Sequence, residues 1–114
     1  MVPLHVKQTI YFMYNSSQVQ QDFIAVIAAH AQYLVNHSAQ RIILEGHADE
    51  RGTREYNLAL GERRANSAKD YLMTYGVAGN RLSVISYGKE RPVNSGSNPL
   101  AWSQNRRSVT VKAN

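Results

Sequence analysis

One stretch organises the whole chain, Leu44-Glu45-Gly46-His47-Ala48-Asp49-Glu50-Arg51-Gly52-Thr53-Arg54-Glu55-Tyr56-Asn57. The apolar residues at positions 42–44 indicate a buried strand, and the glycine at position 46 interrupts it. Polar residues then gather within five positions, and Thr53 is suited to cap a helix. Because α/β proteins commonly bind ligands where a strand leads through a polar loop into a helix, we expect the functional site in this loop.

The composition describes one globular domain. The chain has 114 residues, of which 43% are hydrophobic and 18% charged, so we expect a single domain over residues 1–114, with residues 1–5 as a tether or a cut end. It contains no cysteine, which excludes disulfides and thiolate metal sites. The net charge is +5, but basic and acidic residues are interleaved, as in Lys89-Glu90-Arg91, so we do not expect nucleic-acid binding.

The first third of the chain predicts a strand and an amphipathic helix. Residues 6–12 alternate between apolar and polar types, which is typical of a strand. Ser17 is expected to cap a helix over residues 18–36, with Gln20 as its capping-box partner. The expected buried stripe of this helix comprises Val19, Phe23, Val26, Ile27, His30 and Leu34.

The rest of the chain predicts three strands and a second long helix. The strand at residues 41–46 is nearly all apolar, as expected if both of its faces are covered. Thr53 should cap the second helix, Gly61 should kink or restart it, and Gly76 should end it. Strands are expected at residues 82–87 and 107–112, and the loop between them should end in a helical turn near Trp102. The buried stripe of the second helix should comprise Leu58, Gly61, Ala65, Ala68, Leu72 and Tyr75.

These elements follow each other in the order β-α-β-α-β-β, which we assign to the α+β class. The two β-α-β crossovers predict right-handed connections between parallel neighbouring strands. Helices should cover the resulting sheet.

The polar loop admits three kinds of site. His47 and Asp49 would project to the same side of an extended segment, so with Glu50 they could begin a metal site, although zinc needs a third protein ligand. His47 could instead serve as the base of a small hydrolase, but no nucleophile motif accompanies it. Surface ion pairs are the simplest interpretation, and we favour them for Glu50, Arg51 and Glu62 but not for Asp49. No cofactor is expected.

Four motifs of the chain stand in register with a known family. The central motif is Gly46–Thr53, followed by Glu55–Asn57 and Leu60–Asn66. Two later motifs are Ser86–Pro92 and Ser103–Val109, and Tyr11-Phe12 forms the first. Together they resemble the OmpA-like peptidoglycan-binding domain, most closely its lipoprotein branch, over about residues 10–111.

The resemblance implies a fold and a site. The fold would be a two-layer sandwich with a mixed four-stranded sheet of order 1-4-2-3, its last strand antiparallel. The site would bind the meso-diaminopimelate side chain of peptidoglycan without catalysis, because two opposite charges at fixed separation suit a zwitterion. Asp49 matches the family's acid for the ammonium, and Arg64 matches its arginine for the carboxylate. Further pocket positions match Tyr14, Asn15, Thr53 and Leu60.

The resemblance also implies partners and a location. The domain would anchor the outer membrane of a Gram-negative bacterium to its cell wall, with a TolB-like periplasmic protein as partner. A lipid anchor absent from this chain would hold it at the periplasmic face of that membrane. His47, Glu50 and Arg51 would then belong to the scaffold or face a partner.

The chain departs from the family in the loop after the first strand. The usual Asp-Phe-Asp is replaced by Met13-Tyr14-Asn15. If the family uses this loop through its backbone, binding should survive, whereas affinity should be lower if the second acid contributes charge. A protein-interaction module with weak or no wall binding therefore stays open. In the motif Asn105-Arg106-Arg107, we expect the asparagine to bond local backbone and one arginine to pair with a carboxylate near Asp49.

Overall fold

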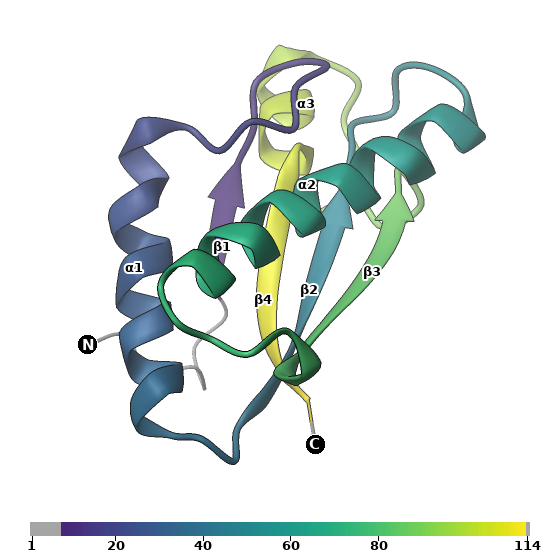
Figure 1. The fold of residues 1–114 in the computed structure, drawn as a ribbon. Coiled ribbons are helices and arrows are strands. Elements are labelled where there is room, and N and C mark those ends of the chain that lie inside the picture. Colours follow the sequence, from purple (N-terminus) through teal and green to yellow (C-terminus); the bar gives the residue numbers. More distant parts are fainter. Residues whose placement is uncertain (1–7, 114) are drawn as a thin grey trace.

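A computed structural model of the chain describes residues 8–113, in which helices and strands alternate (Figure 1). This confirms the predicted order of the main elements and adds the short 3-10 helix η1. The expectation for residues 1–5, and residues 6–7 of the expected first strand, lie outside the described residues. The elements are β1 (Gln8–Tyr11), α1 (Gln21–Asn36), β2 (Arg41–His47), α2 (Arg54–Thr74), η1 (Gly79–Arg81), β3 (Leu82–Gly88), α3 (Pro99–Asn105) and β4 (Arg107–Ala113).

The strands form one sheet in the order β1-β4-β2-β3. β2 and β3 are parallel, whereas β4 is antiparallel to both β1 and β2. This confirms the sheet that the family resemblance implied. The expectation that each crossover joins parallel neighbours is right for β2 and β3 but wrong for β1 and β2, because β4 inserts between those two strands and pairs with both.

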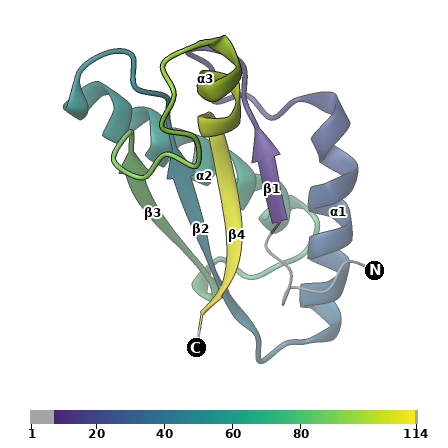
Figure 2. The ribbon, with the colours of Figure 1, turned by 180° about the vertical axis from the view of Figure 1, so that it is seen from behind.

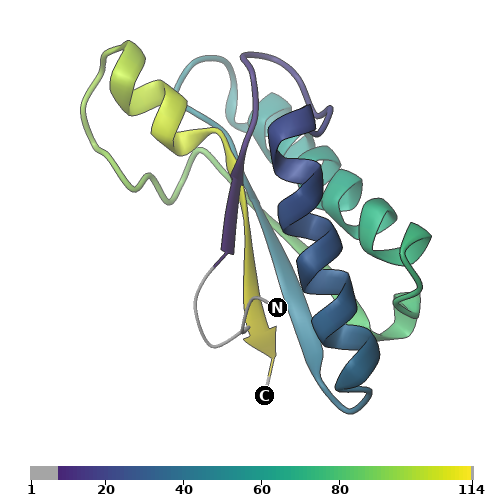
Figure 3. The ribbon, with the colours of Figure 1, turned by 90° about the vertical axis from the view of Figure 1, so that its left-hand side faces the viewer.

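The helices α1 and α2 lie on one face of the sheet, while α3 and the loop before it lie at one end on the opposite side (Figure 3). Ile42 and Leu44 of β2 are fully buried in the core that the two long helices share. Ile43 and Glu45 are half-buried on the opposite face of the sheet. Figure 2, which is turned by 180° from Figure 1, shows this face toward the viewer. The two-layer fold is confirmed, but the expectation that both faces of β2 are covered is wrong, because the long helices pack on one side only.

The start of α1 differs from the prediction. The helix begins at Gln21, not at residue 18, and Ser17 does not cap it. The cap residue is Gln20, whose side-chain Nε2 donates instead to the Tyr11 carbonyl at 3.0 Å. The Ser16 carbonyl accepts from Arg64 Nε at 2.8 Å. These two long-range hydrogen bonds hold residues 16–20 outside the helix. They replace the local capping box expected between Ser17 and Gln20.

The cap of α2 agrees with the prediction. Thr53 Oγ1 accepts a hydrogen bond from the Tyr56 amide at 3.1 Å. The helix ends at Thr74, and Gly76, which follows the cap residue Tyr75, has a φ of 105°, a left-handed conformation that glycine adopts without strain. The amides of Gly76 and Val77 bond back to carbonyls of the last turn, as in a Schellman motif. Local chemistry therefore sets both ends of this helix.

Gly61 neither kinks nor restarts α2, which runs unbroken from Arg54 to Thr74. Its role is to let the helix approach β2, because a Cβ at Gly61 would lie only 2.9 Å from the Gly46 carbonyl oxygen. Four of the six residues expected in the buried stripe are buried, whereas Leu58 is half-buried and Tyr75 is exposed. The buried residues of α2 are Asn57, Leu60, Gly61, Arg64, Ala65, Ala68 and Leu72.

The short helix α3 confirms the turn predicted near Trp102. Asn98 Oδ1 accepts from the Ala101 amide at 2.9 Å, and Pro99 occupies the first turn, where its missing N–H costs nothing. None of the helices in residues 8–113 is long and apolar enough to cross a bilayer.

The imidazole of His30 should make the stability of the fold depend on pH. It lies on the buried face of α1 with 2% exposure, and its Nε2 has no hydrogen-bond partner among the described residues. Burial lowers the pKa of His30 from 6.5 to about 4. The unfolded chain therefore binds this proton near pH 6.5, whereas the folded chain resists it down to about pH 4. Stability contributed by the neutral imidazole is complete above pH 6.5 and is lost as the pH falls toward 4, by on the order of 2 kcal/mol at pH 5.

Urea unfolding of the wild type and of His30→Leu between pH 7 and pH 4.5 measures this effect. We expect the leucine variant to show a shallower decline of unfolding free energy with falling pH. Part of the slope should remain, because burial, Arg107 and Arg91 also lower the pKa of His47 to about 4. Identical slopes for the two proteins would contradict the assignment to His30.

Candidate functional site

A pocket of about 320 Å³ opens where the loop after β1, the loop after β2 and the first turns of α2 meet. These segments gather at one end of the sheet (Figure 1). Five of the six residues singled out in the sequence line it, and Thr53 does not, because its side chain caps α2. The lining residues are Tyr14, Asn15, Asp49, Arg51, Gly52, Tyr56, Asn57, Leu60 and Arg64.

Asp49 is the buried acid of the pocket, with 4% exposure. Its Oδ1 accepts from the Arg51 amide at 2.9 Å and from Arg51 Nε at 3.1 Å, and its Oδ2 accepts from Arg51 Nη2 at 2.8 Å. Arg106 Nη1 lies 3.6 Å from Oδ2. Burial alone would raise the pKa of Asp49, but the Arg51 hydrogen bonds outweigh it and hold that pKa below its ordinary value. Asp49 is therefore ionised at neutral pH.

The ion pairs of Asp49 are formed with neighbouring arginines of the protein. Arg51 was expected in a surface ion pair, and it does form one, but its partner is the buried Asp49; within residues 8–113 Asp49 also pairs with Arg106 and has no ion pair with Arg64. The guanidinium of Arg51 is also held between two aromatic rings, with Cζ 4.0 Å from the Tyr14 ring centre and 4.1 Å from that of Trp102. Such contacts with aromatic faces favour a cation. Sequence reasoning missed Trp102 because it comes from α3, far along the chain.

Arg64 is the second charged group of the site, and it is fully buried. Its guanidinium donates to three backbone carbonyls: from Nε to Ser16 at 2.8 Å, from Nη1 to His47 at 2.9 Å and from Nη2 to Met13 at 3.2 Å. Burial lowers the pKa of Arg64 to about 10, so it stays protonated at neutral pH. Arg64 thus fastens the loop after β1 to the end of β2 while its side chain also lines the pocket.

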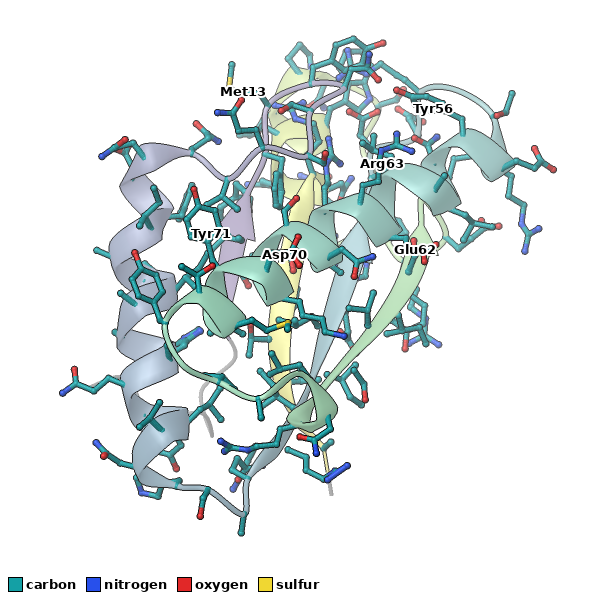
Figure 4. The ribbon with its side chains drawn as sticks, in the orientation of Figure 1. Met13, Tyr56, Glu62, Arg63, Asp70 and Tyr71 are labelled. Carbon is teal, nitrogen blue, oxygen red and sulfur yellow. The ribbon has the colours of Figure 1, made fainter. Side chains whose placement is uncertain are left out.

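The loop after β1 meets Arg64 through its backbone. The Met13 and Ser16 carbonyls accept from the guanidinium, and the Met13 and Tyr14 side chains are exposed (Figure 4 labels Met13). Asn15 adopts φ 56°, a left-handed conformation that asparagine tolerates better than most residues. The departure of Met13-Tyr14-Asn15 from the family pattern therefore changes side chains but leaves the backbone bonds of the loop to Arg64.

Glu50 and Asn105 join the loops around the pocket. Glu50 was expected in a surface ion pair, but its Oε2 instead accepts from Trp102 Nε1 at 2.7 Å and from the Ser97 hydroxyl. The Asn105 side chain accepts from the amides of Val93 and Asn94. Together with the contact of Arg106 on Asp49, this confirms the structural role predicted for the motif that begins at Asn105.

The geometry does not support a hydrolytic or metal site at His47. His47 lines a different pocket, on the open face of the sheet, and its ring nitrogens have no hydrogen-bond partner among the described side chains and backbone. The expectation that His47 and Asp49 project to the same side is wrong, because β2 ends at His47 and Asp49 lies in the loop beyond it, so the two side chains line different pockets. The described part of the chain also holds no group of three His, Cys, Asp or Glu residues that could bind a metal.

Comparison with known proteins adds three findings. A model of the OmpA family matches residues 11–106. Proteins named peptidoglycan-associated lipoprotein are similar: that of Mesorhizobium japonicum is 51% identical over 95% of this chain and 64% of its own length, and that of Pseudomonas aeruginosa is 52% identical over 87% of this chain and 58% of its own. The chain thus spans less than two thirds of the length of these relatives.

Solved structures agree with these relatives. The peptidoglycan-associated lipoprotein of Burkholderia pseudomallei superposes with a TM-score of 0.91 at 42% identity, covering 92% of this chain and 89% of that one. The cell wall anchor of the T6SS from Pseudomonas aeruginosa gives a TM-score of 0.75 at 28% identity, covering 95% and 81%.

Proposed function

The chain belongs to the OmpA family, and from this premise we propose that it binds the peptide stem of peptidoglycan non-covalently and anchors an envelope protein to the cell wall. The names of its relatives, which describe peptidoglycan-associated lipoproteins and a cell wall anchor, support this function and a protein that is not an enzyme. The pocket beside Asp49 is the proposed site.

One observation carries the proposal: the pocket is lined by a buried acid, Asp49, and a buried arginine, Arg64, which form no ion pair with each other among the described residues. Within the described residues, Asp49 pairs with Arg51 and Arg106, and Arg64 bonds backbone carbonyls. A guanidinium has five N–H groups, so Arg64 keeps two beyond these three bonds. We assign the ammonium of meso-diaminopimelate to Asp49 and its carboxylate to Arg64.

The remaining candidate residues would shape the pocket. Tyr14, Asn15 and Leu60 line it, and Thr53 would act indirectly by capping the helix that carries Arg64. The loop after β1 bonds Arg64 through its carbonyls, which favours retained binding despite the loss of two acids relative to the family pattern. It argues against the alternative of an interaction module without wall binding.

The wider role is a proposal about the whole protein, because the chain spans less than two thirds of the length of its relatives. We propose that the full-length protein is a lipoprotein at the periplasmic face of the outer membrane. By similarity to peptidoglycan-associated lipoproteins, it would belong to the Tol–Pal system and bind a TolB-like periplasmic protein. Radiolabelled palmitate incorporated into the full-length protein, together with co-purification of TolB, would test these two points.

The ligand assignment is best tested by editing the ligand, because Arg64 is too buried to be replaced without disturbing the fold. We expect the domain to co-sediment with purified sacculi and to bind a soluble stem peptide containing meso-diaminopimelate. The matched peptide with L-lysine keeps the ammonium but lacks the carboxylate next to it, so it should bind about tenfold or more weakly. Calorimetric titration measures both peptides. Equal affinities would exclude the assigned role of Arg64, and failure to bind sacculi would exclude the proposed function.

A further inference from the structure

The position that Asp49 would offer to a ligand ammonium is already filled by Arg51. Among residues 8–113, the three hydrogen bonds that the Asp49 carboxylate accepts all come from Arg51, two of them from its guanidinium. The guanidinium is stacked between Tyr14 and Trp102, which come from two other segments of the chain. A cation of the protein itself thus has the partners expected for a cation of the ligand.

We propose that Arg51 is an internal competitor for the ammonium subsite of Asp49, and that ligand binds by exchanging its own ammonium for this guanidinium. The inference rests on the proposed function of the pocket. It makes Arg51 a specificity-determining residue, because a ligand group must hold Asp49 better than Arg51 does in order to bind.

The contacts make such an exchange feasible. The side chain of Arg51 is 32% exposed, whereas that of Asp49 is 5% exposed, so the arginine has a path into solvent and the acid does not. The bond from the Arg51 amide to Oδ1 belongs to the backbone and remains when the side chain leaves. Arg106, 3.6 Å from Oδ2, also remains. The Asp49 carboxylate would therefore stay in place, and the acceptor positions that the guanidinium leaves would be free for the ammonium of the ligand.

The exchange also explains why the subsite would reject neutral groups. Removal of Arg51 from a buried carboxylate costs charge-assisted hydrogen bonds, which are the strong ones in proteins. Only another cation that bonds the same oxygens restores them. A compact ammonium satisfies this requirement, and the faces of Tyr14 and Trp102 that the guanidinium leaves become available to the ligand.

The experiment compares Arg51→Gln with Arg54→Gln, which removes one positive charge three positions away. Arg54 is exposed, pairs with Glu90 at 2.8 Å and does not line the pocket. In calorimetric titrations of the meso-diaminopimelate stem peptide, we expect Arg51→Gln to bind about three- to thirtyfold more tightly than the wild type, because no internal cation has to be displaced. Arg54→Gln should match the wild type within about twofold.

A second readout follows the arginine itself. Trp102 is the one tryptophan of the chain, and its ring contacts the Arg51 guanidinium. Binding of the peptide to the wild type should change the tryptophan emission as the cation leaves. Arg51→Gln should begin with altered emission and change less on binding, while Arg54→Gln should behave as the wild type does.

The outcomes separate this inference from the proposed function. If the wild type binds and Arg51→Gln binds equally or more weakly, Arg51 supports the ligand or orients Asp49, and the exchange is refuted while the proposed function stands. If neither protein binds the peptide or sacculi although both are folded by circular dichroism, the proposed function fails and the exchange fails with it. Tighter binding by Arg51→Gln, with a smaller fluorescence response than that of the wild type and the control, supports the exchange.

Discussion

Arg64→Ala should lower the free energy of unfolding by about 3–5 kcal/mol, a large part of the stability of a domain of this size. The side chain is fully buried and donates hydrogen bonds at 2.8–3.2 Å to the carbonyls of Ser16, His47 and Met13. Alanine would leave those carbonyls without this donor and would leave a cavity against Phe12, whose ring centre lies 5.4 Å from Cζ. The expected loss combines both costs.

Chemical unfolding followed by circular dichroism measures this loss, and the neighbouring Arg63→Ala is the matched control. Arg63 is exposed on the same helix, and its guanidinium lies 6.0 Å from the Tyr56 ring centre (Figure 4). The control should change stability by no more than about 0.5 kcal/mol. A loss below about 1 kcal/mol for Arg64→Ala would mean that water replaces the arginine and that its role is not structural. Because Arg64 is fully buried, binding by Arg64→Ala would not separate a role in the ligand site from a role in stability.

The burial of Arg64 also shows where sequence reasoning stops. Local signals at Thr53 and Gly76 predicted the ends of α2, because caps depend on residues a few positions apart. Ser17 and Gln20 carry the same kind of signal, yet the helix starts later. The Ser16 carbonyl is bound by an arginine 48 positions away, and that contact is invisible to a local pattern.

The sheet shows the same limit. Alternation in the last strand correctly separates Ser108 and Thr110 from Val109, but it does not say which set faces the helices. Thr110 pairs with Leu44, and Ser108 pairs with Gly46, so the polar set lies on the helix face. Hydrophobicity alone would place the valine there. The order of the strands became predictable only through the family resemblance.

The candidate site was predictable as a set of residues but not as a set of contacts. Asp49, Arg64, Tyr14, Asn15 and Leu60 come together in one pocket, as the resemblance implied. The pairing of Asp49 with Arg51, two positions later, depends on the shape of the loop that follows β2. The stacking of Arg51 between Tyr14 and Trp102 depends on α3, which carries Trp102 and is placed by long-range contacts.

Asp49→Asn should weaken binding of the meso-diaminopimelate stem peptide, and of sacculi, by about 30-fold or more, since loss of one member of a desolvated charge pair costs about 2–5 kcal/mol. Asparagine keeps an oxygen that can accept from the Arg51 amide, so the loop should keep its shape, but it removes the charge that attracts an ammonium. Arg51 and Arg106 would then face the ligand cation without the acid that now balances them. Attraction at the subsite would become repulsion.

Glu62→Gln is the control for this change, because it removes the same charge from an exposed position of α2 outside the pocket (Figure 4). The affinity of this variant for the stem peptide should stay within about twofold of that of the wild type, since salt screens an exposed charge outside the pocket. Calorimetry with the peptide and co-sedimentation with sacculi should rank the three proteins alike. If Asp49→Asn binds as the wild type does while its unfolding free energy is unchanged, the ammonium is held elsewhere, and both the assignment of Asp49 and the exchange with Arg51 are wrong. If it fails to bind while Arg51→Gln binds more tightly than the wild type, one carboxylate serves two competing cations.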